Sequence, residues 1–349
     1  NYEINKHFDA YMEVMYMTYY TDAQIAPSGA FGIGVALSCE NPMFSEQQRG
    51  LLCGPGTGYD PTGHTNIGIQ RRNVEGDPRI HQIGHTNSRL VAGLRGDLSD
   101  VWSYDLSLLR AQNDLRYSVI NDMDWERMIY ALDVIEDEGT GEWVCSNEQA
   151  RADGCVPWNI FTEGGVTPES VDYLSTVVVF FETTRTELAN LTFAGDLEAY
   201  GAKIPSASEG LQLATGTEVR NEWLSFVPDE VTQRGTAGVG GHGSDPVESD
   251  FTVKELFVEV LLPVIQDASG ARDLSFELGY RYSDYSSFGG ADTYKAMFSW
   301  AVSDSWRLRG GYNRAVRAPS LWELYDIQMQ LNSDYIDPCE GAHPTATFE

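Results

Sequence analysis

Apolar and polar residues alternate along much of the chain, most regularly between Phe251 and Tyr325. In this stretch about ten residues with apolar side chains at every second position end in polar or turn residues, and the pattern then begins again. From residue 274 to 283 the even positions are Leu, Phe or Tyr, whereas the odd positions are Ser, Glu, Gly or Arg. Successive side chains of a β-strand point to opposite faces. The pattern therefore predicts a sheet with one apolar and one polar face, as in the wall of a β-barrel.

The same period predicts about nine strands along the whole chain. The joins between these strands alternate between short and long, which is typical of an up-and-down barrel in an outer membrane. Bacterial barrels close with an even number of strands, so we expect an incomplete antiparallel transmembrane β-barrel. The predicted strands are 8–19, 84–97, 101–117, 185–197, 210–224, 251–263, 273–285, 292–302 and 305–316.

Charged residues on these strands share one parity. A Lys or Arg facing lipid at mid-depth costs about 2–4 kcal/mol, so we expect the charged parity to face the lumen. Opposite charges on adjacent strands can then pair inside the barrel. The residues concerned are Glu218, Arg220 and Glu222, then Glu255 and Glu259, then Glu277 and Arg281, and finally Arg307 and Arg309.

Composition excludes several classes of protein. Aromatic residues make up 11% of the 349 residues and glycine is abundant, as in strands with aromatic girdles and glycine-rich loops. The net charge of -29 excludes a nucleic-acid partner, because phosphate binding needs clustered Lys and Arg. The longest apolar candidate, residues 176–181, is too short for a membrane helix. The chain starts without a signal peptide, so we expect either that one was removed or that the chain is a fragment.

The cysteines predict two local disulfides in loops. Cys39 and Cys53 lie in one Gly/Pro-rich segment, and Cys145 and Cys155 lie in another. Neither pair has the spacing of a zinc or thioredoxin-like site. Two disulfides imply an oxidising compartment, whereas the alternative is four reduced cysteines. Cys339 has no partner nearby, which again predicts a truncated chain.

Motifs that carry catalytic or metal chemistry are weak. Residues 238–243 match the dinucleotide fingerprint, but a strand rather than a helix follows them, so we interpret them as a flexible loop. His81 and His85 are interpreted as surface histidines in a loop leading into a strand. The acidic residues around Asp122 to Glu138 lack the spacing of a calcium loop, and solvated charge is favoured. A short helix is predicted within residues 126–138.

One segment resembles a family signature. Residues 317–325 read Arg-Ala-Pro-Ser-Leu-Trp-Glu-Leu-Tyr. This is similar to the Phe-Arg-Ala-Pro-Ser-x-x-Glu-Leu signature of TonB-dependent outer-membrane receptors, with Val316 in place of the Phe. Residues 253–260, 277–285 and 308–312 also resemble barrel strands of that family. The signature positions are Arg317, Ala318, Pro319, Ser320, Glu323 and Leu324.

The resemblance implies a plugged barrel of 22 strands in the outer membrane of a Gram-negative bacterium. Such receptors bind a scarce small-molecule or oligomeric nutrient and import it when the TonB-ExbB-ExbD complex acts on an N-terminal plug. This chain contains no plug or TonB-binding box, so we expect one partial barrel domain over residues 1–349. No catalytic residue, cofactor or metal is expected. Long extracellular loops are expected at about 20–83, 118–184, 225–250 and 317–349.

Candidate substrate contacts in these loops are Trp143, Trp158, Tyr173 and Trp322, although loop packing or a membrane girdle is the favoured interpretation of each one singly. Outer-membrane lipid and lipopolysaccharide are further expected partners. Two alternatives stay open: a passive porin or adhesin barrel, and a soluble all-β carbohydrate-active enzyme.

Overall fold

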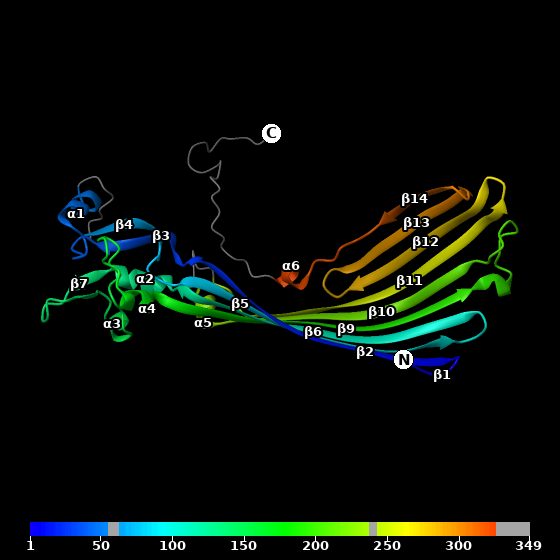
Figure 1. Cartoon of the computed structure of the whole chain (residues 1–349), viewed down its shortest axis with the longest axis horizontal. Coiled ribbons are helices and arrows are strands. Elements are labelled where there is room, and N and C mark those ends of the chain that lie inside the picture. The colour runs from blue at the N-terminus through cyan, green and yellow to red at the C-terminus, as the bar shows by residue number, and fades with distance from the viewer. Residues whose placement is uncertain (55–62, 237–242, 326–349) are drawn as a thin grey trace.

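One antiparallel sheet of ten strands dominates the computed structural model, which describes residues 1–54, 63–236 and 243–325 (Figure 1). The strands follow one another in the order β1-β2-β5-β6-β9-β10-β11-β12-β13-β14, each antiparallel to its neighbour. The sheet curls but does not close, and β1 and β14 are its edges. The strands are β1 Tyr2–Asn5, β2 Phe8–Pro27, β5 Pro78–Asp97, β6 Trp102–Met123, β9 Ser175–Asp196, β10 Gln212–Pro228, β11 Val247–Ala268, β12 Ala271–Tyr285, β13 Gly289–Ser303 and β14 Trp306–Arg314.

The predicted fold class, an incomplete up-and-down β-barrel, is confirmed. All nine predicted strands are present, but the sheet has a tenth, β1, whose four residues are too few to show an alternating pattern. Several strands are also longer than predicted: β9 begins at Ser175 rather than 185. Its added residues include Val177, Val178 and Val179, a continuous β-branched run that reads as a strand without alternation. Among the described residues, no helix is long and apolar enough to cross a membrane.

Two excursions from the sheet pack together into a separate lobe at one end of the strands (Figure 1). The first lies between β2 and β5, and the second lies between β6 and β9. We define the lobe as residues 28–54, 63–77 and 123–174. Its elements are β3 Gly29–Ser38, α1 Glu46–Leu52, β4 His64–Arg72, α2 Trp125–Leu132, β7 Val134–Glu136, β8 Trp143–Cys145, α3 Glu148–Ala152 and α4 Pro168–Leu174.

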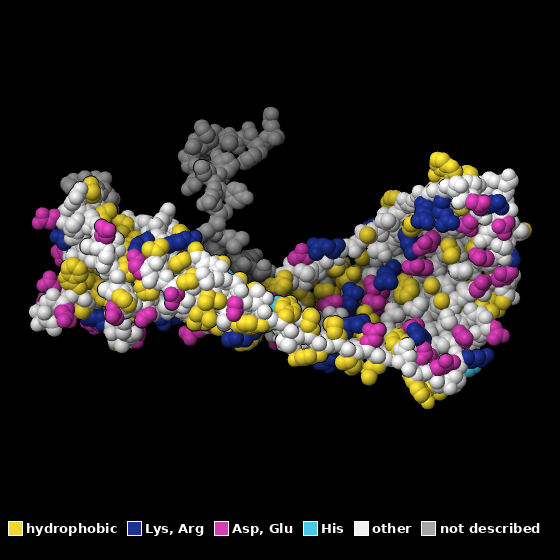
Figure 2. Space-filling model, viewed as in Figure 1, with side chains coloured by type: hydrophobic (Ala, Val, Ile, Leu, Met, Phe, Trp, Pro, Cys, Tyr) yellow, Lys and Arg dark blue, Asp and Glu magenta, His cyan; other side chains and the backbone are white. Residues whose placement is uncertain are grey.

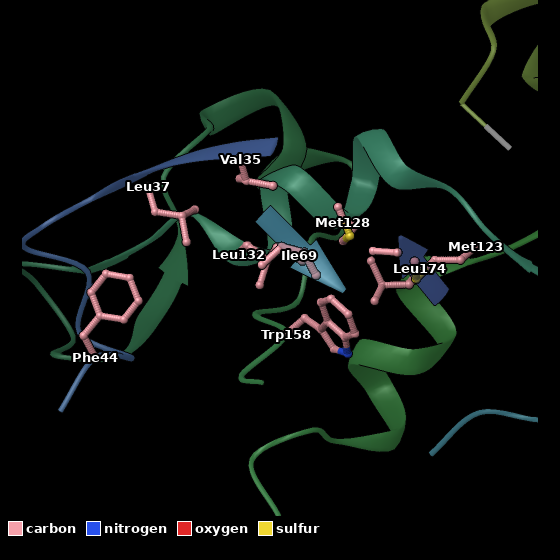
Figure 3. Close-up of a cluster of buried hydrophobic side chains, with 11 residues drawn as sticks. Val35, Leu37, Phe44, Ile69, Met123, Met128, Leu132, Trp158 and Leu174 are labelled. Atoms are coloured by element: carbon pink, nitrogen blue, oxygen red, sulfur yellow. The ribbon is translucent and has the colours of Figure 1, made fainter. Parts of the chain in front are cut away.

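The lobe has its own hydrophobic core (Figure 3). Side chains from both excursions meet there around Trp158, whose exposed fraction is 0%. Neither excursion could bury these groups alone, since Val35 and Ile69 come from the first and Met128 and Leu174 from the second. The remaining core residues are Ala30, Leu37, Phe44, Met123, Ala131 and Leu132.

Both predicted cysteine pairs lie in this lobe as disulfides. Cys39 is joined to Cys53 with a Cα–Cα distance of 5.9 Å, and Cys145 to Cys155 with a distance of 6.3 Å. Each bond closes a local loop, the first around α1 and the second around α3. Such cross-links stabilise small units that lack a large core. Cys339 and most of the fingerprint at 238–243 lie outside the described residues.

The helix predicted within 126–138 is shorter than expected. α2 starts after Asp124, whose carboxylate accepts hydrogen bonds from the backbone N–H groups of Glu126 and Arg127, and it ends at Leu132. Val134 and Ile135 belong instead to β7, which pairs with β8. Apolar spacing alone does not distinguish these β-branched residues from a last helical turn.

Position 216 requires glycine because the Phe257 side chain and the Leu191 backbone lie too close for a larger residue. Gly216 lies directly opposite Phe257, and a Cβ added to it would lie 2.6 Å from Phe257 Cζ and 2.4 Å from the backbone oxygen of Leu191. We expect Gly216→Val to lower the free energy of unfolding by about 1–3 kcal/mol, because the added atoms overpack the wall. The matched control is Gly68→Val in β4, where an added Cβ meets nothing within 4 Å. Equal midpoints of denaturation for the two variants would contradict this packing.

Candidate functional site

The charged parity predicted from sequence lies on the concave face of the sheet (Figure 2). Three cations of this face, Arg220, Arg281 and Lys295, contact carboxylates on it. Arg281 Nη1 lies 3.0 Å from Glu255, and Lys295 Nζ lies 2.5 Å from Glu277 and 3.1 Å from Glu259. The Arg281–Glu255 and Lys295–Glu277 pairs join neighbouring strands, as predicted. Arg220 differs, since it pairs with Glu218 and Glu222 of its own strand at 3.3 and 3.1 Å.

Lys295 reaches Glu259 by crossing an intervening strand. Glu259 is opposite Gly279 in the β11–β12 pair, and Gly279 is opposite Lys295 in the β12–β13 pair. A Cβ at Gly279 would lie 2.7 Å from Lys295 Cε. Because residue 279 is a glycine, the aliphatic part of the Lys295 side chain has room to pass over it toward Glu259.

The concave face has a hollow of about 410 Å³, lined by five of these charged groups: Arg220, Glu255, Glu259, Arg281 and Lys295. Glu255 is its most buried charge, with a side chain 6% exposed that accepts hydrogen bonds from Ser283 Oγ at 2.5 Å and Arg281. The hollow thus presents positive and negative groups side by side. Its further lining includes Phe257, Thr293, Asn313, Ala315 and Val316.

The opposite, convex face carries an apolar band. Leu108, Val219 and Leu256 lie on it and are exposed, as are Leu278 and Tyr280 on the next strand. Toward the lobe, the band meets a polar residue two positions further along on three of these strands, namely Arg110, Asn221 and Lys254, and on β12 it meets Asp284 after Tyr282. The band therefore has a polar border on these strands, and only this face could contact hydrocarbon without burying charge.

The signature segment follows β14 and forms a short helix, α6 Leu321–Tyr325, on the concave side (Figure 1). Arg317 donates two hydrogen bonds of 2.8 Å to the carboxylate of Glu323. The backbone N–H of Ser320 donates a third at 2.8 Å, and Ser320 Oγ accepts from the backbone N–H of Glu323. The spacing of the signature residues thus makes a closed local clamp.

A family model described as "TonB dependent receptor-like, beta-barrel" matches residues 44–346. The chain belongs to this family. TonB-dependent receptors are receptors and transporters rather than enzymes, and the two-faced sheet described above is the barrel wall of such a receptor.

Among solved structures, the chain is similar to the siderophore receptor PirA from Pseudomonas aeruginosa. The identity is 14% and the TM-score 0.30, and the match covers 71% of this chain and 38% of that one. The chain therefore corresponds to well under half of that receptor's length. None of the curated proteins compared matches the sequence.

The four predicted substrate contacts of this TonB-dependent receptor lie in different surroundings. Trp158 is fully buried in the lobe core, where Arg71 stacks 5.5 Å from its ring centroid, so it has no surface to offer a ligand. Tyr173 packs against the same core, and burial raises the pKa of its hydroxyl. Trp143 is exposed on β8. Trp322 alone lies on the concave side, on α6. The structure does not bring the four together.

A row of rings on the concave face was missed from sequence. His81, Tyr117, Phe180, Phe226 and Trp322 follow one another across β5, β6, β9, β10 and α6. Successive ring centroids are 5.6, 4.7, 5.2 and 5.3 Å apart. We call this set the aromatic row. His81 and Tyr117 share the parity of the lumen-facing charges, so part of the pattern was present in the sequence. The predicted strands 84–97, 185–197 and 210–224, however, leave out His81, Phe180 and Phe226.

The described part of the chain contains no group of three or more His, Cys, Asp or Glu side chains arranged to hold a metal ion. The acidic residues considered for calcium serve local structure instead. Asp122 accepts a hydrogen bond from Ser28 Oγ at 2.5 Å, and Asp124 begins α2. Asp137 accepts from Gly139 and Thr140 in a turn, which lowers the pKa of its carboxyl.

The hydrogen bonds of the clamp in the signature segment predict how its stability depends on pH. Hydrogen bonds from Arg317 and from the Ser320 backbone lower the pKa of Glu323 from 4.5 to about 2. The stabilisation is therefore fully present above pH 4.5 and is lost as the pH falls through 2. We expect the ¹³C carboxyl resonance of Glu323 to titrate near pH 2 in the native protein, and near its ordinary value in Arg317→Gln. An unchanged midpoint in that variant would contradict the clamp.

Proposed function

We propose that this protein is an outer-membrane receptor that binds a scarce nutrient outside a Gram-negative cell and imports it by TonB-coupled active transport. The observation that carries the proposal is the family match over residues 44–346, together with a wall whose charges lie on one face and whose apolar band lies on the other. The apolar band contacts membrane lipid in this proposal, and the concave face lines the lumen.

The lengths of the connections between strands indicate which end of the sheet faces the periplasm and which faces the outside of the cell. The turn between β11 and β12, residues 269–270, and the turn between β13 and β14, residues 304–305, are short, whereas the lobe lies at the opposite end. We place the short turns in the periplasm and the lobe outside the cell, close to lipopolysaccharide. Its two disulfides suit that oxidising location. The loops expected at 20–83 and 118–184 supply the lobe, although the ends of both ranges continue the sheet strands.

We expect partner proteins to supply the energy for import. In the proposed mechanism the TonB-ExbB-ExbD complex acts on a plug within the lumen, and the paired charges of the concave wall are the surface that faces it. The pairs of Lys295 with Glu277 and Glu259 are exposed, and exposed pairs are each worth about 0–1 kcal/mol, so a folded segment can move past them without a large barrier. This arrangement favours repeated docking and release.

An uptake assay tests the proposal. Cells carrying or lacking the gene are supplied with labelled iron chelates, cobalamin or oligosaccharides, with and without a protonophore and in a TonB deletion. We expect uptake of one class to require the gene, the proton gradient and TonB. Uptake that survives the protonophore and the TonB deletion would indicate a passive porin instead. Recovery of the native protein in a detergent-free soluble fraction would exclude both barrel functions. Complementation by the Val258→Ala variant, altered only on the convex face, controls for expression.

A further inference from the structure

An apolar basin interrupts the polar concave wall. Leu224 and Phe226 of β10 share the parity of Arg220, and Phe251 and Val253 of β11 share the parity of Glu255. We call these four residues the apolar basin. Their exposed fractions are 1%, 8%, 6% and 0%. Large apolar side chains on a water-filled lumen would be exposed, so something covers them.

The cover is α6. This helix contacts both β10 and β11 on their concave side. Trp322 packs edge-to-face on Phe226, with ring centroids 5.3 Å apart and planes at 73°. The same phenylalanine lies 5.2 Å from Phe180, so the indole extends the aromatic row by one ring. A single side chain from outside the sheet thus covers Phe226 of the basin and completes the row.

The indole also lies beside a polar group. Its side chain is close enough to the carboxylate of Glu182 to favour the charged form of that group. Glu182 is directly opposite Phe226 in the β9–β10 register, so the ring contact and the acceptor come from neighbouring positions of the wall. The wall at this point therefore presents a ring face and an acceptor group side by side. An aromatic carboxylate would be repelled there by Glu182.

The cover is built to move as a unit. The Arg317–Glu323 clamp holds α6 together without help from the sheet, and Arg317 is 76% exposed. Residues 315–320 connect the helix to β14 without forming a strand or helix. Lifting α6 therefore breaks the contacts of Trp322 and uncovers the basin, while the clamp itself stays closed.

We propose that Trp322 is an internal stand-in for the ligand: it occupies the apolar basin of the unliganded chain, and a neutral or cationic ligand with an aryl ring and an N–H or O–H donor displaces it. Phe226 and Phe180 bind the ring, and Glu182 accepts from the donor. This inference rests on the proposed function, because it names the substrate class that the receptor takes.

The test uses two probes that differ in one group, indole and 1-methylindole, titrated calorimetrically into the full-length protein in detergent. Removing the competing indole side chain frees the basin, so Trp322→Ala is expected to bind indole roughly tenfold more tightly than the native protein. Because 1-methylindole lacks the N–H, it is expected to bind Trp322→Ala several-fold more weakly than indole does. That difference is expected to disappear in Trp322→Ala/Glu182→Gln.

The control variant is Trp306→Ala, which removes an exposed tryptophan of β14 and is expected to leave indole binding unchanged. Trp322→Phe, which keeps a ring over the basin, confirms that any change comes from uncovering it. Indole affinity that is unchanged or reduced in Trp322→Ala would overturn the proposal, as would equal affinities for the two probes in that variant. These binding results do not depend on TonB, so failure of coupled uptake with tighter indole binding would overturn the transport function and leave the site standing.

Discussion

Replacing Arg281 with leucine is expected to lower the free energy of unfolding by about 3 kcal/mol, because it leaves the carboxylate of Glu255 buried without its cation. Glu255 has a side chain 6% exposed and keeps only the hydrogen bond from Ser283 after the change. Denaturant titration of the purified protein, followed by the shift of the folded band in electrophoresis, measures the loss.

Two further variants sharpen this prediction. Lys295→Leu removes a cation whose partners, Glu277 and Glu259, are 43% and 49% exposed, and we expect it to cost less than about 1 kcal/mol. Arg281→Leu/Glu255→Leu removes both members of the buried pair and is expected to recover most of the loss. Similar losses for Arg281→Leu and Lys295→Leu would show that burial does not set the strength of these pairs.

Replacing Trp158 with alanine is expected to destabilise the lobe by about 3–5 kcal/mol, because it opens a cavity in a core to which both excursions contribute. The sheet has its own hydrogen-bonded ladder, so the loss should be confined to the lobe. Limited proteolysis is expected to cleave within residues 28–77 and 123–174 of the variant at concentrations that leave native protein intact.

Trp143→Ala is the matched control, since that tryptophan belongs to the same lobe but is exposed on β8. We expect it to change the stability of the lobe by less than about 0.5 kcal/mol. Cleavage of Trp158→Ala within the sheet strands as early as in the lobe would show that the two parts unfold together. Equal protease sensitivity of the two tryptophan variants would show that Trp158 does not hold the lobe.

Alternation predicted the sheet well, because a wall with lipid on one side and a lumen on the other must alternate. Glu255, Arg281 and Glu277 could be assigned to one face from parity alone, and the structure pairs them across strands. The lobe could not be predicted in this way. Trp158 and Ile69 are 89 positions apart by their numbers, and their contact depends on how two excursions pack, which carries no periodic signal.

The concave aromatic residues were hidden for a related reason. Phe226 and Phe251 share the parity of the charged residues but are apolar. The strands that carry them are contacted by α6, which begins 95 positions after Phe226 and 70 after Phe251. Sequence reasoning treated Trp322 as one loop aromatic among several. Only its position over Phe226 distinguishes it from Trp143, which is exposed, and from Trp158, which is core.

The central claim, that one face of this sheet meets lipid and the other lines a lumen, is tested most directly by a spin-label scan of residues 255–260 in β11, with the full-length protein in bilayers. We predict that collision with oxygen peaks at positions 256, 258 and 260, whose side chains belong to the apolar convex face, and falls at 255, 257 and 259. A water-soluble nickel chelate should show no peak at the convex positions. Collision rates that do not alternate, or convex positions that the chelate reaches as readily as oxygen does, would contradict the account.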